Sequence, residues 1–157
     1  MQGDPQVIAF LNAQLKNELA AVNQYFLHAK MLQNWGYERL GEHEYKESIE
    51  EMKHADRLME RILRLDGSPN VQDLGKLLIG HNVPEVLDGD LRLERGSQKT
   101  LKEAIACCEA AGDYVSREIL AGILEDTEEH IDFLETQIAL VGEVGLQNYL
   151  QSQMKPA

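Results

Sequence analysis

The sequence predicts an all-α protein: a four-helix bundle with one long crossover and a short fifth C-terminal helix. Its apolar residues recur every three to four positions over long segments, which is typical of helices that bury one face. Glycine and proline fall mainly between those segments, where they predict turns. No segment shows the alternation typical of a β-strand. The length of 157 residues fits one domain, 1–157, with a core of its own.

Cap and turn residues predict the first pair of helices. Asp4 followed by Pro5 is typical of a helix start, because the N-cap carboxylate precedes a residue that needs no hydrogen-bond donor there. Gly36 ends the first helix, and the turn residues DGSPN at 66–70 end the second. The turn between the two helices is short, so we expect them to be antiparallel.

The second half of the chain repeats this arrangement after a long connection. The stretch 71–82 has two glycines and no clear period, so it predicts the crossover between two helix pairs. Pro84 lies in the first turn of the third helix, and Gly112 with Asp113 separates that helix from the fourth. Together these signals predict helices at about 5–35, 39–65, 83–111, 114–141 and 146–154.

The charge of the chain excludes two classes of partner. Its formal net charge is −12, and an acidic surface repels phosphate, so neither nucleic acid nor an anionic membrane is expected to bind it. No apolar run approaches the roughly 20 residues that span a bilayer. The N-terminus, MQGDPQVIAF, lacks the basic start and apolar centre of a signal peptide. We therefore expect a cytoplasmic protein.

Polar side chains interrupt the apolar stripe of every long helix near its middle. Buried carboxylates without basic partners would cost several kcal/mol, and divalent cations would offset that cost. Carboxylate and imidazole ligands suit iron, manganese or zinc, and residues three apart share one helix face. The interrupting residues include Glu18 in the first helix, Glu51 and His54 in the second, Glu94 in the third, and Thr127 and His130 in the fourth. The stripe of the second helix also contains Glu44 and Glu47.

Simpler explanations exist for each residue alone. A single Glu-x-x-His pair such as Glu51 and His54 is usually solvated, and Glu18 alone could pair with a basic residue across the bundle. The combination of two glutamate-bearing and two histidine-bearing helices, all in register with the apolar stripes, favours a two-metal site. The predicted ligands, which are also the predicted catalytic residues, are Glu18, Glu51, His54, Glu94 and His130.

Six stretches carry a resemblance to a known family: QGDPQVIAFLNAQLKNELAAVNQYFLHAKM, ESIEEMKHADRLMERIL, NVQDLGKLLIG, DYVSREIL, HIDFLETQ and GLQNYLQSQM. With them the chain resembles the bacterioferritins over nearly its whole length. The resemblance implies a ferritin-like bundle, a hollow shell of 24 subunits that stores ferric mineral, and a di-iron ferroxidase centre. It implies that Glu18 and His54 hold one iron, that Glu94 and His130 hold the other, and that Glu51 bridges them near Tyr25.

The resemblance also implies haem b on a twofold axis between subunits. Each subunit would contribute one methionine, at the position of Met52 here. Met52 lies on a second face of the second helix, with Ile49, Met59 and Leu63. Without the resemblance, a methionine on such a face would be interpreted as packing at a dimer contact.

Thr127 departs from the family pattern. The resemblance implies a second bridging glutamate at this position, and a neutral hydroxyl on a short side chain cannot replace it. Asp126 lies on a neighbouring side of the helix and is shorter than a glutamate. Lys46 and Glu50 stand where some family members carry a histidine and an aspartate that pass electrons from iron in the cavity, and a charged lysine is a poor metal ligand.

Several functions remain open from the sequence. The chain is either a working ferroxidase that stores iron with haem-assisted release, or a haem-carrying subunit with an impaired centre that co-assembles with a ferroxidase-competent subunit. A homo-oligomer and a mixed 24-mer are both compatible with it. A ferredoxin is the expected electron donor for iron release. A small di-iron oxidase or peroxidase is the competing enzyme class, and it predicts a small oligomer in place of a shell.

Overall fold

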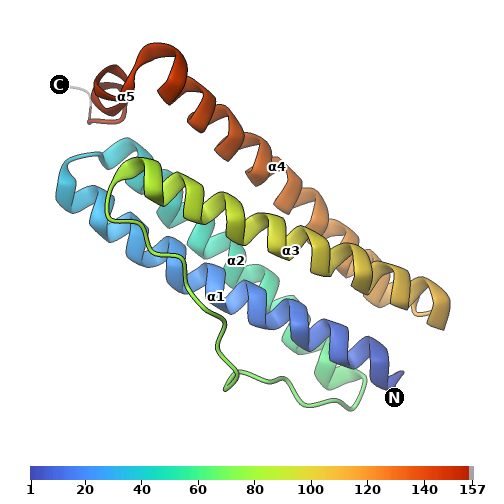
Figure 1. Ribbon diagram of the computed structural model, residues 1–157. Coiled ribbons are helices and arrows are strands. Elements are labelled where there is room, and N and C mark those ends of the chain that lie inside the picture. Colours follow the sequence, from blue (N-terminus) through green and yellow to red (C-terminus); the bar gives the residue numbers. More distant parts are fainter. Residues whose placement is uncertain (156–157) are drawn as a thin grey trace.

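The computed structural model describes residues 1–155 and folds into the expected all-α bundle (Figure 1). The short C-terminal helix and the long crossover are both present. α4 extends three residues beyond its predicted end at 141, because Gly142 is compatible with a helix, whereas Gly145 takes a positive φ of 86° and stops it. The helices are α1 (Pro5–Trp35), α2 (Glu38–Arg64), α3 (Val83–Ala111), α4 (Tyr114–Val144) and α5 (Leu146–Ser152).

Local chemistry sets the helix ends. The Asp4 side chain accepts hydrogen bonds from the backbone N–H groups of Gln6 and Val7, with Pro5 in the first turn. Gly36 ends α1 with a φ of 95°, a conformation that favours glycine. Asn82 and Asp113 cap α3 and α4 in the same way as Asp4 caps α1.

The apolar core is divided into two clusters, one toward each end of the bundle. Leu11, Leu58 and Leu120 are members of the cluster near the N-terminus. Leu40 and Leu134 belong to the other, which also includes Tyr149 of α5. The buried carboxylates and imidazoles lie along the helices between these clusters, so hydrophobic packing on both sides holds them in place.

The crossover is tied to the bundle by buried polar side chains. The Leu78 N–H donates to Gln24 Oε1 at 2.8 Å, and the Gly80 N–H donates to His28 Nε2 at 3.0 Å. Asp90 Oδ1 accepts hydrogen bonds from both Gln24 and His28, which links α1 to α3. These bonds satisfy backbone groups that would otherwise be buried without partners.

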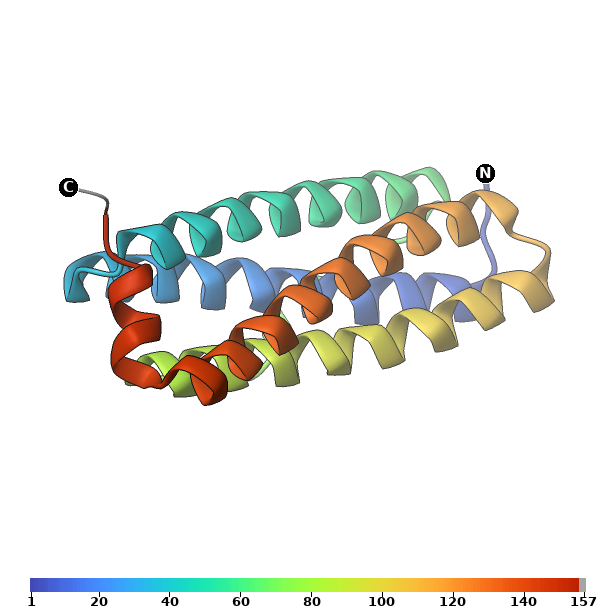
Figure 2. The same cartoon turned by 90° about the horizontal axis from the view of Figure 1, so that it is seen from above.

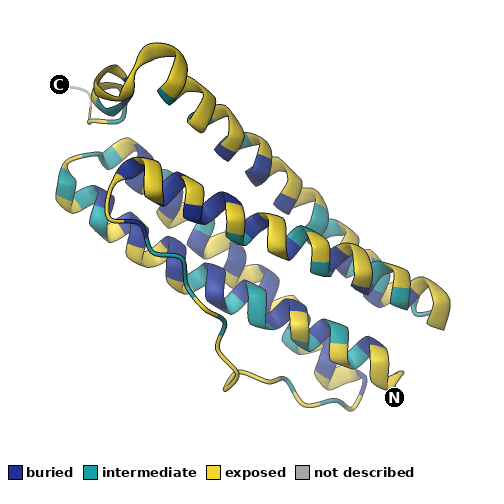
Figure 3. Cartoon of the chain, viewed as in Figure 1, coloured by how far each residue is buried: buried dark blue, intermediate teal, exposed yellow. Residues whose placement is uncertain are grey.

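α4 crosses the bundle obliquely and diverges from α2 toward its C-terminal end (Figure 2). Buried residues gather on the inner faces of α1, α2 and α3, while the last turns of α4 are largely exposed (Figure 3). α2 and α4 therefore border a cavity, described below. Within residues 1–155, none of the helices combines the length and the hydrophobicity that a membrane span requires.

Candidate metal centre

The four long helices bring the five predicted ligands together in the middle of the bundle. Glu18 comes from α1, Glu51 and His54 from α2, Glu94 from α3 and His130 from α4. Each of these five residues is at most 5% exposed. Thr127 is equally buried beside them. The side chains form two groups, each centred on one histidine.

The first group consists of Glu18, Glu51 and His54. His54 Nδ1 lies 3.4 Å from Glu18 Oε2 and 3.6 Å from Glu51 Oε2, and one ligand atom from each residue lies within 4.8 Å of the other two. Glu18 Oε2 and His54 Nδ1 have no hydrogen-bond partner in the described chain. Two carboxylates and an imidazole nitrogen thus converge on one point, as the ligands of a divalent cation do.

Two residues outside this group orient its ligands. Asp126 of α4 lies with Oδ2 2.8 Å from His54 Nε2, so the ring donates Nε2–H to Asp126 and directs Nδ1 at Glu18 and Glu51. Gln14 donates to Glu18 Oε1 at 2.9 Å and to Ser97 Oγ at 2.8 Å. Such partners fix the tautomer and the direction of metal-binding groups. The sequence indicated that Asp126 lies on a neighbouring side of its helix, and the structure shows that it nevertheless contacts His54.

The second group is centred on His130. Its Nδ1 lies 3.4 Å from Glu94 Oε1 and 3.1 Å from the hydroxyl of Tyr25, which donates to Glu94 at 2.6 Å. The Thr127 hydroxyl donates to the backbone carbonyl of Ile123 at 2.9 Å, within its own helix. Threonine therefore supplies no negative charge here, and its one proton is already engaged.

Two residues that the sequence analysis did not assign also lie beside His130. Glu47 Oε2 is 3.6 Å from His130 Nδ1, and ligand atoms of His43, Glu47 and His130 all lie within 4.8 Å of one another. The spacing of His43, Glu47 and His54 was a usable signal, since residues four and eleven apart share one face of a helix. A cavity of about 340 Å³ between α2 and α4 is lined by His43, Glu47, His54 and His130, among others.

Burial changes the acid–base properties of the centre. Loss of solvent raises the pKa of Glu51 well above its usual range, with Glu18 adding to the effect, and burial likewise raises the pKa of Glu94. Burial also raises the pKa of Glu47 to about 7. Although burial opposes it, the adjacent carboxylates of Glu18 and Glu51 raise the pKa of His54 to about 11. The buried carboxyl groups therefore favour their protonated forms, and a cation that bound among them would displace protons.

A third buried group, His28, Glu44 and Asp90, is explained by structure. Its ligand-type atoms also lie within 4.8 Å of one another. However, His28 Nε2 accepts the Gly80 N–H and Nδ1 lies 2.9 Å from Asp90, so both ring nitrogens are used. Burial and the neighbouring Asp90 raise the pKa of Glu44 well above its usual range, which favours a neutral carboxyl. This group holds the crossover and offers no free imidazole nitrogen.

Comparison with known proteins gives one consistent result. The Ferritin-like domain family matches residues 8–143. The chain is 48% identical over 157 residues to a bacterioferritin of Brucella melitensis, covering 100% of this chain and 98% of the relative. It is 48% identical over 149 residues to a bacterioferritin of Mycobacterium leprae, covering 95% and 94%, and 48% identical over 155 residues to a bacterial ferritin of Pseudomonas aeruginosa, covering 98% and 100%.

Proposed function

Because this chain belongs to the bacterioferritin family of ferritin-like proteins, we propose that it stores iron and that its bundle oxidises Fe2+ before storage. The observation that supports this function is the pair of buried carboxylate–imidazole groups in mid-bundle. Fe2+ is the substrate. Glu18 and His54 bind one ion, Glu94 and His130 bind the second, and Glu51 lies between them. We propose that it acts in the cytoplasm.

The proposed reaction transfers two electrons from Fe2+ to an oxidant. Two Fe2+ ions lose one electron each, and O2 takes up both electrons with two protons to become hydrogen peroxide. Alternatively, one hydrogen peroxide takes up the two electrons and two protons to become two water molecules. The protein contributes binding, orientation and charge, since its glutamates stabilise Fe3+ more than Fe2+. The Fe3+ product then moves to the interior of the shell as mineral.

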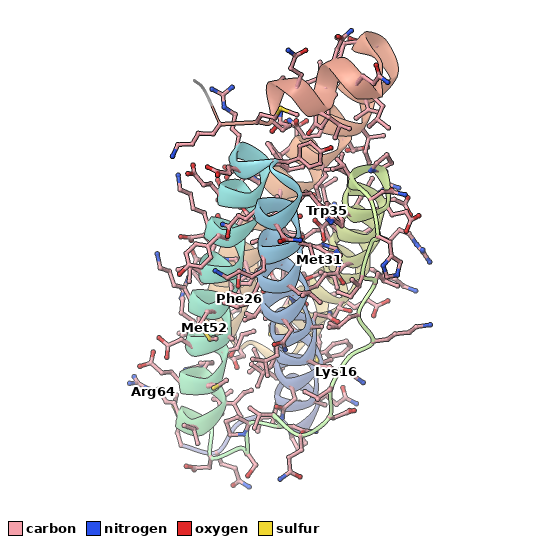
Figure 4. The ribbon with its side chains drawn as sticks, turned by 90° about the vertical axis from the view of Figure 1, so that its left-hand side faces the viewer. Lys16, Phe26, Met31, Trp35, Met52 and Arg64 are labelled. Atoms are coloured by element: carbon pink, nitrogen blue, oxygen red, sulfur yellow. The ribbon has the colours of Figure 1, made fainter. Side chains whose placement is uncertain are left out.

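We propose assembly into a 24-subunit shell, as family membership implies. One outer face of the bundle, where α1 and α2 lie side by side, carries the exposed apolar side chains of Phe26 and Met52 (Figure 4). Tyr45 is also exposed, and its ring centroid lies 6.0 Å from that of Phe26. Exposed apolar patches of this kind mark contacts between subunits. The net charge of −12 per chain helps a shell to attract Fe2+.

Haem b fits the same face. Met52 of α2 is 48% exposed, and its thioether is not packed into the core (Figure 4). Ile49 and Leu63, on the same face of α2, are also exposed and apolar, which suits a haem held between two symmetric copies of the face. Met52 and its copy would hold the haem iron, and the group would supply electron transfer for the release of stored iron. A ferredoxin is the proposed electron donor.

Thr127 supports a second candidate function. Its hydroxyl is bonded to Ile123, so the second metal position lacks the carboxylate that the family places at 127. The chain would then be a haem-carrying subunit with an impaired ferroxidase centre. It would assemble with a ferroxidase-competent subunit into a mixed shell, and it would need only to bind iron and haem. The small oxidase or peroxidase remains a third candidate. Its native mass would be far below that of a 24-subunit shell, because it would form a small oligomer.

The test is the initial rate of aerobic Fe2+ oxidation at two irons per subunit. Wild type, Thr127→Glu and Glu51→Gln are compared as purified homopolymers. A wild-type rate clearly above that of Glu51→Gln supports ferroxidase function, and a rate equal to it contradicts that function. If only Thr127→Glu is fast, the impaired subunit in a mixed shell is the better description. A Soret band that is present in wild type and lost in Met52→Leu tests the haem.

A further inference from the structure

We infer that Glu47 and His43 of α2 complete the second metal position with His130, in place of the carboxylate that residue 127 lacks. The inference rests on the proposed iron-binding function and names two ligands that the family pattern does not assign. The ion bound there would be a first-row divalent cation, since two imidazoles with the carboxylates of Glu47 and Glu94 suit Fe2+, Co2+ or Zn2+.

The two halves of the centre have matching geometry. His54 Nδ1 lies 3.4 Å and 3.6 Å from oxygens of Glu18 and Glu51. His130 Nδ1 lies 3.4 Å and 3.6 Å from oxygens of Glu94 and Glu47. Two ligand atoms that each lie about 2.1 Å from one ion, at octahedral or tetrahedral angles, are separated by roughly 3.0 to 3.5 Å. Glu47 therefore stands to His130 as Glu51 stands to His54.

The balance of charge also supports Glu47 as a ligand. Two divalent cations carry four positive charges, and a buried pair of cations needs a similar negative charge from its ligands. Glu18, Glu51 and Glu94 supply three. Glu47 supplies the fourth from one helical turn before Glu51, so α2 provides a carboxylate to each ion.

Two ring nitrogens of this group have no hydrogen-bond partner. Within residues 1–155, His43 Nε2 and His130 Nε2 are buried and make no hydrogen bond. His130 is only 3% exposed, and it lines the cavity between α2 and α4 together with His43 and Glu47. The His43 ring is held in place by stacking on Phe133, with ring centroids 3.7 Å apart. Buried polar atoms without protein partners are atoms that a bound ion or water would contact.

The position is also the more accessible half of the centre. The Glu47 side chain is 21% exposed, whereas the Glu51 side chain is 6% exposed. An ion held by Glu47, His43 and His130 would lie toward the cavity, where cations enter from solvent. His54 lines the same cavity, so Fe2+ would reach the inner position, at Glu18, Glu51 and His54, from it as well.

The experiment titrates metal-stripped, assembled protein with Co2+ alone and follows its visible absorption bands and binding heat. We expect two Co2+ per subunit in wild type. Glu47→Gln should weaken the second Co2+ by roughly tenfold or more while the first stays unchanged. Adding Thr127→Glu to Glu47→Gln should restore the second ion, because it returns a carboxylate to the same position. Glu129→Gln is the matched control, since Glu129 lines the same cavity and is exposed.

The outcomes separate this inference from the proposed function. If Glu47→Gln binds two Co2+ with wild-type affinity, Glu47 is not a ligand. If wild type binds one Co2+ that Glu51→Gln loses, the inner position exists and the inference about the second position fails. If wild type binds none, the proposed metal-binding function fails as well. Retention of two ions in Glu129→Gln, with loss in Glu47→Gln, supports the inference.

Discussion

Asp126 shows how a single side chain outside the ligand set can control a ligand. It is half exposed, yet its carboxylate holds the Nε2–H of buried His54 at 2.8 Å. The bond leaves Nδ1 as the nitrogen that faces Glu18 and Glu51. Removing the carboxylate would free the ring to rotate or to change tautomer, even though no atom of Asp126 lies within the first metal group.

We therefore expect Asp126→Ala to weaken Co2+ binding at the inner position by about 10- to 100-fold, as loss of such supporting partners typically does. Co2+ titration of metal-stripped protein measures the change. Glu125→Ala is the control, because Glu125 is the exposed neighbour on the same helix and removes the same charge. Equal affinity in Asp126→Ala and Glu125→Ala would mean that Asp126 does not orient His54.

At the scale of elements, the fit of the crossover to α3 depends on a glycine. A Cβ added at Gly89 would collide with the backbone carbonyl oxygen of Leu78, so the crossover can lie against α3 only if residue 89 has no side chain. Leu78 is itself held to α1 by its hydrogen bond to Gln24. Neither the crossover nor α3 can move at this contact without breaking hydrogen bonds to Gln24.

Gly89→Ala should therefore lower the free energy of unfolding by about 1 to 3 kcal/mol, the usual cost of overpacking. Gly96→Ala is the matched control in the same helix, since nothing lies within 4 Å of a Cβ there. We expect it to be neutral or to stabilise by up to about 1 kcal/mol, through helix propensity. Denaturant unfolding of both variants measures the difference, and a Gly89→Ala variant as stable as Gly96→Ala would show that the crossover yields easily.

For the whole molecule, the buried centre makes stability depend on pH and on metal. A group whose pKa is raised by folding stabilises the fold at low pH and loses that contribution as pH rises through its folded pKa. Burial raises the pKa of Glu47 to about 7, and although burial opposes it, the adjacent carboxylates of Glu18 and Glu51 raise the pKa of His54 to about 11. Both contributions decline between pH 6.5 and 8.5.

The metal-free protein should thus unfold at a lower temperature at pH 8.5 than at pH 6.5. A loss of about 1 kcal/mol would lower the midpoint by roughly 2 to 4 °C in a chain of this size. Co2+ should reverse the trend, because cations displace protons and bind more tightly as pH rises. Thermal unfolding with and without Co2+ measures both effects. A metal-free midpoint that rises with pH would contradict this account of the centre.

Much of this protein is determined by local sequence. Asp4, Gly36 and Asn82 mark helix ends through their own side chains or backbone freedom, so the elements follow from neighbours in the chain. Helical periodicity also indicates that Glu18, Glu94 and His130 are buried, because a 3.6-residue repeat identifies the inner face of each helix. The bundle and the five central polar residues were therefore predictable.

Tertiary structure alone decided which residues meet across helices. Asp126 reaches His54, and Glu47 and His43 reach His130, because α4 crosses α2 obliquely and brings these positions of the two helices into contact. Periodicity describes one helix at a time and carries no information on the rotation and crossing angle of its neighbour, which side-chain packing along both helices determines. The ligand type of each helix is thus a property of the sequence, and the pairing of those ligands is a property of the fold.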